Sequence, residues 1–369
     1  MERLRISAVV GVVVGLAVAG LPLAASAGGG FLSGFSTIST VGTTVPGNGD
    51  VNPYGIVVVP KSAGRLVAGD VLISNFNNSN NFQGTGSTLV ELSPTGNLTL
   101  FAQINASHLP GKCPGGVGLT TALDVLPDGF VAVGSLPTTD GMPDTIGAGC
   151  ILILDSRGTV VETISGRSIN GPWDMTEANT EDGATLFVTN VLNGTVGAGG
   201  GVVNRGTVVR IRLQIDGHHR PRVTSETTVA SGLGERTDRS ALVVGPTGLG
   251  LGRDGTLYVA DSEYNRIAAI PDALTRHDTA FSGLDVTANG LINDPLGLTI
   301  APNGDIVSAN GGDGNLVETT PQGTQLAFKQ VDGSGTPPGA GALFGLAVAP
   351  HGGGVYFVDD ATNMLELLH

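Results

Sequence analysis

Six copies of one strand-and-turn frame run along this chain, and this repetition constrains the fold more than any other feature of the sequence. Each copy opens with a short apolar alternation, turns at a pair such as Asp-Gly or Asn-Gly, and continues into a second apolar run that usually ends in Asn or Asp. The copies begin at Tyr54, Thr121, Trp173, Thr247, Leu296 and Phe344. Alternation with period two and Gly-containing turns predict β-strands, whereas helical periodicity is nearly absent.

The frame predicts an all-β fold in which every copy is one blade of a six-bladed β-propeller, because a unit of about 50 residues with four short strands is typical of propeller blades. Residues 28–369 then form a single propeller domain. The sixth copy supplies only three strands, at 344–349, 354–359 and 363–368, while an orphan strand lies at 35–41. We expect that N-terminal strand to pair into the last blade as its outermost strand and to close the ring. The alternative is five and a half blades with an unpaired N-terminal tail.

The first 27 residues have the order of a secretory signal peptide. Arg3 and Arg5 precede the uncharged apolar run 6–21, and the small residues Ala25-Ser26-Ala27 follow it. We therefore expect cleavage after Ala27 and export to the periplasm or the extracellular space; a retained membrane anchor is the alternative. No later run approaches 18 consecutive apolar residues, so no membrane span is expected once the signal is removed.

Cys113 and Cys150 are the two cysteines of the chain. Export favours a disulfide between them, because exported proteins fold in an oxidising compartment. Closing the loop between them would stabilise the fold by about 3–4 kcal/mol. Two free thiols are the alternative.

The charge balance limits the partners that this chain can bind. Lys and Arg number 18 against 32 Asp and Glu, which gives a formal net charge of −14. Nucleic acid is therefore excluded as a partner, since a protein that binds phosphates needs a basic surface. Cationic partners are permitted, and we expect a monomer.

The copy at 246–270, PTGLGLGRDGTLYVADSEYNRIAAI, resembles an NHL repeat, whose pattern runs P-x-G-aliphatic, D-G-x-L-Y-V-A-D-S and N-R-I. The likeness is fair in the copies that begin at Leu296 and Phe344 and weak in the first three. The family implies a six-bladed propeller that usually has a binding role, and related propellers include lactonases and lyases. Family membership does not settle the activity.

The blades also resemble, distantly, enzymes of the gluconolactonase type, and that resemblance implies a divalent cation at the propeller centre. Asp261, in Tyr258-Val-Ala-Asp261, matches an aspartate ligand of those enzymes. Thr247 stands where the family has Asn, and Tyr54 stands where a Glu is expected. Asp261 alone is insufficient for a hard cation, which needs several oxygen ligands. We therefore expect no metal and no other cofactor, with a divalent cation near Asp261 as the alternative.

The turns of the frame differ in length between the two faces of the predicted propeller. Turns between first and second strands, such as 127–129 and 302–304, are short, and we name their side the tight-turn face. Turns between second and third strands and connections between blades lie on the opposite, long-loop face. Its long segments are 76–87, 105–120, 136–149, 191–205 and 231–245. Long loops on a rigid scaffold usually carry binding residues, although loops that lengthened without function are the alternative.

Two rings of residues form the candidate site on the long-loop face. The first residue of each copy should surround the mouth of the central channel, and three of these six, Tyr54, Trp173 and Phe344, are aromatic. The residue that ends the second strand of each copy should form another ring, namely Asn75, Ser135, Asn190, Asp261, Asn310 and Asp359. The candidate ligand-binding residues are Tyr54, Thr121, Trp173, Asp174, Thr247, Asp261, Asn310, Phe344 and Asp359. Packing between blades explains the aromatic ring equally well, and turn hydrogen bonds are the alternative for the second ring.

These observations predict an exported, NHL-like propeller that binds a small ligand or a protein partner through its long-loop face. The alternative is a lactonase, esterase or lyase of the gluconolactonase-like group. No H-E-x-x-H, G-x-S-x-G or P-loop motif occurs in the sequence, so catalytic residues stay unassigned.

Overall fold

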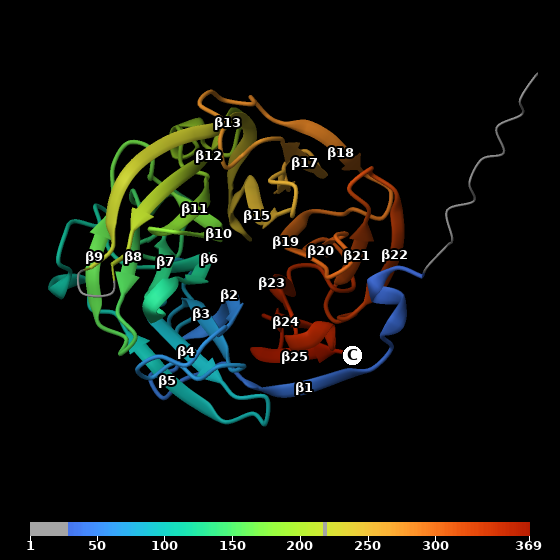
Figure 1. Ribbon diagram of the computed structural model, residues 1–369, viewed down its shortest axis with the longest axis horizontal. Helices are drawn as coiled ribbons and strands as arrows, with labels where there is room; N and C mark the ends of the chain where they lie inside the picture. The colour runs from blue at the N-terminus through green and yellow to red at the C-terminus, as the bar shows by residue number, and fades with distance from the viewer. Residues whose placement is uncertain (1–28, 217–219) are drawn as a thin grey trace, which may run out of the picture.

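The computed structural model describes residues 29–216 and 220–369, so the predicted signal peptide at 1–27 lies outside the described residues. The described residues form six antiparallel sheets around a central axis, which confirms the six-bladed β-propeller (Figure 1). Helical structure within them is confined to short 3₁₀ turns: η1 (Phe31–Gly34), η2 (Ala106–His108), η3 (Pro127–Gly129), η4 (Pro143–Thr145), η5 (Val196–Ala198) and η6 (Pro350–Gly352). None of these helices is long and apolar enough to cross a membrane.

Blades 1 to 3 follow one another from the N-terminal side, and the first strand of each lies nearest the axis (Figure 1). Blade 1 contains β2 (Val51–Val58), β3 (Val71–Asn77), β4 (Thr88–Leu92) and β5 (Leu98–Gln103). Blade 2 contains β6 (Leu119–Val125), β7 (Val131–Ser135), β8 (Cys150–Leu154) and β9 (Val160–Ile164). Blade 3 contains β10 (Pro172–Thr180), β11 (Gly183–Asn190), β12 (Val203–Gln214), β13 (Arg222–Asp238) and the short β14 (Leu242–Val244).

Blades 4 to 6 complete the ring. Blade 4 contains β15 (Pro246–Leu251), β16 (Leu257–Asp261), β17 (Arg266–Ile270) and β18 (Leu284–Ala288). Blade 5 contains β19 (Pro295–Ile300), β20 (Ile306–Asn310), β21 (Asn315–Thr319) and β22 (Gln325–Gln330). Blade 6 contains β23 (Leu343–Val348), β24 (Val355–Asp359), β25 (Met364–Leu368) and the N-terminal β1 (Ile38–Thr43).

The N-terminal strand closes the ring, as the sequence predicts. β1 pairs antiparallel with β25, so that the order in this sheet is β1-β25-β24-β23 (Figure 1). The strand spans Ile38–Thr43 rather than 35–41, because the chain before it curls into η1. This pairing covers the outer edge of the last blade and joins the two ends of the chain.

The inner strands β2, β6, β10, β15, β19 and β23 contact one another in a closed ring around the axis. They approach most closely at the second residue of the frame, which is glycine in four copies: Gly55, Gly248, Gly297 and Gly345. A Cβ atom at Gly55 would lie 2.6 Å from the carbonyl oxygen of Thr121 on the next blade. Glycine is therefore required there, because a side chain would displace the neighbouring backbone. The other two copies carry Ala122 and Asp174 at this position.

Blade 3 departs from the prediction on the long-loop face. The sequence predicts loops at 191–205 and 231–245, but β12 begins at Val203 and β13 continues to Asp238 before the chain turns into β14. These loop predictions were wrong where the segments pair, with Val203 opposite Glu235 and Asp238 opposite Leu242. Bulges in the β12–β13 ladder, one of them at Gly206, let the two segments stay paired over this length.

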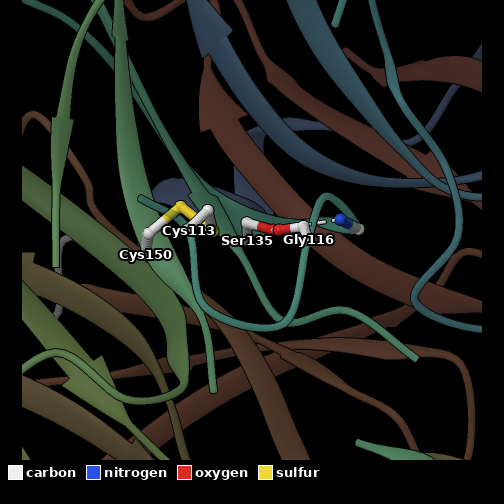
Figure 2. The surroundings of a disulfide bond; sticks show 5 residues. Cys113, Gly116, Ser135 and Cys150 are labelled. Carbon is white, nitrogen blue, oxygen red and sulfur yellow. Dashed lines mark hydrogen bonds between the residues drawn. A yellow bond between two sulfur atoms is a disulfide. The ribbon is translucent and has the colours of Figure 1, made fainter. Parts of the chain in front are cut away.

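The predicted disulfide is present between Cys113 and Cys150, whose Cα atoms are 5.2 Å apart. It ties the connection between blades 1 and 2 to the start of β8 (Figure 2). Beside it, the hydroxyl of Ser135 donates to the carbonyl of Gly116 at 3.1 Å and accepts the N–H of Gly118 at 3.0 Å. Two long segments of the long-loop face are thus braced against each other.

Replacing both cysteines with serine should lower the free energy of unfolding by about 3–4 kcal/mol, because the loop that they close is no longer constrained in the unfolded chain. Urea unfolding of the wild type and of the double variant, each with and without reductant, measures the difference. Reductant should destabilise the wild type by the same amount and leave the double variant unchanged. Equal unfolding midpoints for all four samples would contradict the prediction.

Candidate functional site

Aromatic side chains close the central channel at the long-loop end of the inner strands. Tyr54 is stacked between Phe344 and Phe76, with ring centroids 3.8 and 4.4 Å away. Trp173 meets the edges of this stack, at 5.8 Å from Tyr54 and 5.5 Å from Phe76. Trp173 is only 2% exposed. The predicted aromatic ring therefore exists, but its members pack against one another as an apolar floor of the channel.

The long-loop side of this floor is covered by the additional strand of blade 3. Leu242 and Val243 of β14 belong to the same buried cluster as Tyr54 and Trp173, and Leu136 and Val191 join it from neighbouring loops. Leu242 is fully buried although its φ of 64° lies in the left-handed region, which non-glycine residues rarely adopt. The expected entrance to the channel on the long-loop face is thus closed by apolar side chains.

The channel below the floor is narrow, and its exposed lining is more polar than apolar although most of its side chains are apolar. All six inner strands line it, and the cavity has a volume of about 50 Å³. Water occupies roughly 30 Å³ per molecule in the liquid, so the channel accommodates few waters or one slender group of a ligand. Its polar lining comes from three residues that the sequence predicts for the site, namely Thr121, Asp174 and Thr247.

The hydroxyl groups of the two threonines form hydrogen bonds within the protein. The hydroxyl of Thr121 donates to the backbone carbonyl of Trp173 on the next blade. The hydroxyl of Thr247 donates to the carbonyl of Gly245 at 2.9 Å and lies 3.0 Å from the hydroxyl of Ser262. These contacts satisfy both hydroxyl groups inside the protein, so the carboxyl group of Asp174 is the polar side-chain group of the channel that a ligand can address.

Asp174 replaces the glycine of the frame in blade 3 and crosses toward blade 4. Its carboxylate accepts the backbone N–H of Leu249 at 3.0 Å, while its own N–H donates to the hydroxyl of Thr189 at 2.9 Å. Burial raises the pKa of Asp174 to about 8, although hydrogen bonds from the N–H groups of Met175 and Leu249 oppose this rise. Near neutral pH this carboxyl group is consequently protonated in most molecules.

Two further acids lie toward the tight-turn ends of the same strands. Glu177 on β10 is half-buried, and burial raises its pKa to about 7. Its Oε1 accepts from the amide of Asn179 at 3.1 Å, whereas its Oε2 is buried without a hydrogen-bond partner. Burial, and then the charge of Glu177, raises the pKa of Asp124 on the adjacent β6 well above its usual range. Asp174, Glu177 and Asp124 therefore form an acidic wall along blades 2 and 3.

The tight-turn face carries two large grooves. One groove of about 670 Å³ follows the β10–β11 turn and the end of β12, with Leu274 of blade 4 at its border. A second groove of about 490 Å³ lies between segments 60–63 and 125–129. Both grooves border Asn179, which hydrogen-bonds Glu177. The face with short turns, rather than the long-loop face, thus offers space next to the acidic wall.

In the second predicted ring, formed by the residues that end the second strand of each copy, side chains form hydrogen bonds to neighbouring loops. Asn75 donates to the carbonyl of Thr44 at 3.0 Å, and the side-chain oxygen of Asn190 accepts the N–H of Asn170 at 3.2 Å. Asn310 donates to the carbonyl of Leu291 at 2.8 Å, and Asp359 accepts the N–H of Thr362 at 3.2 Å. All six members of this ring are buried. Turn chemistry accounts for these contacts, and ligand contact with Asn310 or Asp359 stays a prediction.

Asp261 does not offer a fit for a divalent cation. Its Oδ2 lies 2.8 Å from the guanidinium of Arg266, which also pairs with Asp285. Arg266 thus supplies the positive charge that a metal would bring. The described residues contain no group of three or more His, Cys, Asp or Glu side chains that could hold a metal ion. We therefore assign no chemical step to a metal at this position.

Comparison with known proteins shows the fold alone. A gluconolactonase of Xanthomonas campestris, XC5397, matches with a TM-score of 0.54 and 14% identity over 90% of this chain and 88% of that chain. Regucalcin of Agrobacterium tumefaciens, described as a calcium-binding protein, matches with a TM-score of 0.56 and 14% identity over 89% of this chain and 93% of that chain. A luciferin-regenerating enzyme matches with a TM-score of 0.57 and 12% identity over 90% of this chain and 94% of that chain. No protein-family model and no curated protein sequence matches this chain, so the NHL resemblance stays an expectation.

Glu177 and Asp124 were not predicted as members of the site. Both lie on inner strands, at positions where other copies of the frame carry apolar or small residues such as Leu251 and Ala347. An acid at an inner position of a buried strand is the signal that could have identified them. The expectation of an entrance on the long-loop face directed attention to the opposite ends of these strands.

Replacing Trp173 with alanine should lower the free energy of unfolding by about 3–5 kcal/mol, because it leaves a cavity in the aromatic floor. Urea denaturation followed by far-ultraviolet circular dichroism measures the loss. Phe82→Ala is the matched control, because Phe82 is an aromatic residue of the long-loop face that is 46% exposed. The control should change stability by less than about 1 kcal/mol. Similar losses in the two variants would contradict the buried position of Trp173.

Proposed function

We propose that this chain is an exported propeller that binds a small molecule at the tight-turn mouth of its central channel, with Asp174 and Glu177 as polar anchors. The observation that carries this proposal is the carboxyl group of Asp174 at a position where four blades require glycine. A buried acid costs stability unless it is paired, and it is retained most often where it has a function. The predicted signal sequence and the disulfide support export.

The chemistry of the channel favours a ligand that has one slender end with N–H or O–H donors. The cavity of about 50 Å³ favours a slender group, and apart from Thr121, Asp174 and Thr247 the side chains that line it are apolar. A primary amine or a hydroxyl group fits this space and can donate to carboxylate oxygens. An ammonium group would also stabilise the ionised form of Asp174, so its binding should release protons near neutral pH. The larger grooves beside Asn179 have room for the rest of the ligand.

The long-loop face remains a proposed contact surface for a protein partner. Phe82, Met142, Val202 and Tyr264, on loops and turns of this face, are 46, 38, 46 and 44% exposed. Exposed apolar side chains on a braced surface are typical of protein interfaces.

A second candidate function is hydrolysis of a lactone or ester. The observation that favours it is the pKa of about 7 that burial gives Glu177, since a general base works best when its pKa lies near the ambient pH. Glu177 would take a proton from water as the water attacks the carbonyl carbon. The tetrahedral intermediate would then collapse with cleavage of the bond between this carbon and the ester or ring oxygen, and protonated Glu177 would return its proton to the departing oxygen. A protonated Asp174 could donate a hydrogen bond to the carbonyl oxygen on which negative charge develops.

A panel of linear amines, alcohols and carboxylates, tested by titration calorimetry, examines the binding proposal. Amines should bind and release protons, carboxylates should not bind, and Asp174→Asn should weaken amine binding at least tenfold, since a charged hydrogen bond is lost. Asp254→Asn is the matched control, because Asp254 is an exposed acid in the β15–β16 turn of the same face and lines neither groove. Absence of binding for the whole panel, or equal affinities in Asp174→Asn and wild type, would contradict the proposal.

Lactone turnover by the same proteins separates the two candidate functions. If the chain is a hydrolase, Glu177→Gln should lower kcat by about 10²-fold or more while Asp254→Asn retains full activity. Binding of amines without turnover of lactones or esters would support the binding function and contradict the hydrolase.

A further inference from the structure

Blade 3 carries two arginines on the side of its sheet that faces blade 4. Arg210 and Arg212 lie two residues apart on β12, so their side chains leave the same face of the strand. Nη1 of Arg210 donates to the carbonyl of Ala273 at 2.7 Å, and Nη2 of Arg212 donates to the carbonyl of Leu274 at 3.1 Å. Both guanidinium groups therefore cross to the same segment of blade 4.

No acid balances the charges of these two arginines. Among residues 29–216 and 220–369, no Asp or Glu forms a salt bridge with either of them. Arg210 is only 3% exposed, and its Nε is buried without a hydrogen-bond acceptor. Burial, followed by the charge of Arg212, lowers the pKa of Arg210. Buried cations normally have an anionic partner, which this pair lacks.

Arg212 opens onto the groove of about 670 Å³ on the tight-turn face. It is the one basic side chain among the described residues that line this groove, and Thr185 and Leu274 lie beside it. Its hydrogen bond to the carbonyl of Leu274 uses Nη2, so other N–H groups of the guanidinium are available to the groove. A carboxylate is the group that matches a guanidinium best, because it accepts two parallel hydrogen bonds.

The strand register relates Arg212 to the acid of the channel. Arg212 lies opposite Thr185, which lies opposite Ala178 on β10, and Figure 1 shows β10, β11 and β12 in this order from the axis. Neighbouring strands are about 4.8 Å apart, so Arg212 lies about 10 Å across the sheet from Ala178. Asp174 comes four residues earlier on β10, which is about 13 Å along the strand. The Cα atoms of Asp174 and Arg212 are thus roughly 16 Å apart.

We infer that Arg212 binds a carboxylate group of the ligand whose amine end lies at Asp174, so that the ligand is a linear amino acid with its amine and carboxylate at opposite ends. This inference rests on the proposed function, which supplies the amine end. The carboxylate would provide the anion that the two arginines lack, through charge-assisted hydrogen bonds.

Two acids limit the length of such a ligand. Glu181 and Asp182 form the β10–β11 turn at the outer end of the same groove, beyond the pair of Thr185 and Arg212. They would repel a carboxylate that extended past Arg212. Affinity should therefore pass through a maximum as the chain between the two charged groups is lengthened.

Titration calorimetry with linear ω-amino acids and the corresponding ω-amino amides, over a series of chain lengths, tests the inference. The two compounds of each pair share the amine and differ only in the carboxylate. In the wild type the acid should bind at least tenfold more tightly than the amide at the best length, because a charged hydrogen bond is added. Arg212→Gln should bring acid and amide to equal affinity, whereas Arg212→Lys should retain part of the difference, since it keeps the charge.

Arg253→Gln is the matched control. Arg253 is an exposed arginine of the β15–β16 turn that donates to the carbonyl of Pro302 on blade 5 at 3.1 Å, and it lines neither groove. The tenfold preference for the acid should persist in this variant.

The outcomes separate this inference from the proposed function. If the amide binds the wild type and the acid binds no better at any length, the inference is overturned and the amine site stands. A preference for the acid that survives in Arg212→Gln would also overturn the inference. If neither compound binds the wild type, the proposed function fails and the inference fails with it.

Discussion

Close approach of six inner strands around one axis is the constraint on which the rest of this structure depends. The frame places glycine at the point of closest approach in four blades, and the backbones there nearly touch. A ring this tight leaves a channel of only about 50 Å³. Every side chain that enters it displaces water or a neighbour, so each polar residue in the channel carries a cost that the surrounding contacts must offset.

The two ends of the channel contain different kinds of side chain. At the long-loop end Tyr54, Phe76, Trp173 and Phe344 fill the axis with stacked and edge-on rings, and Leu242 covers them. Toward the tight-turn end the inner strands carry acids instead. Aromatic packing provides stability, whereas the acids raise the energy of the folded state when they ionise, which is why burial raises their pKa values.

Much of the architecture could be predicted from the sequence, because period-two alternation and glycine turns act locally. The copies that begin at Thr121 and Phe344 coincide with β6 and β23, which start within two residues of them at Leu119 and Leu343, and the pairing of β1 with β25 is also as predicted. The loop prediction for 231–245 was wrong, because a ladder between distant segments, rather than local composition, decides whether glycines lie in a strand.

The candidate site was predictable in part for a similar reason. Thr121, Asp174 and Thr247 do line the channel, since the frame fixes which residues begin each inner strand. The burial of Trp173 and the closed long-loop entrance depend on β14 folding over from blade 3, and no local pattern encodes this contact. Asp261 also appeared free in the sequence, whereas its partner Arg266 follows it across the tight β16–β17 turn.

The sole tryptophan of the chain, Trp173, allows a direct measurement of the central claim that the channel holds a titrating carboxyl group beside an aromatic floor. Trp173 precedes Asp174, so its emission should respond when that group ionises. We predict a change in Trp173 fluorescence between pH 6 and 9 with a midpoint near pH 8 in the wild type, and its loss in Asp174→Asn. Constant emission over this range in the wild type, or the same midpoint in the variant, would contradict the account.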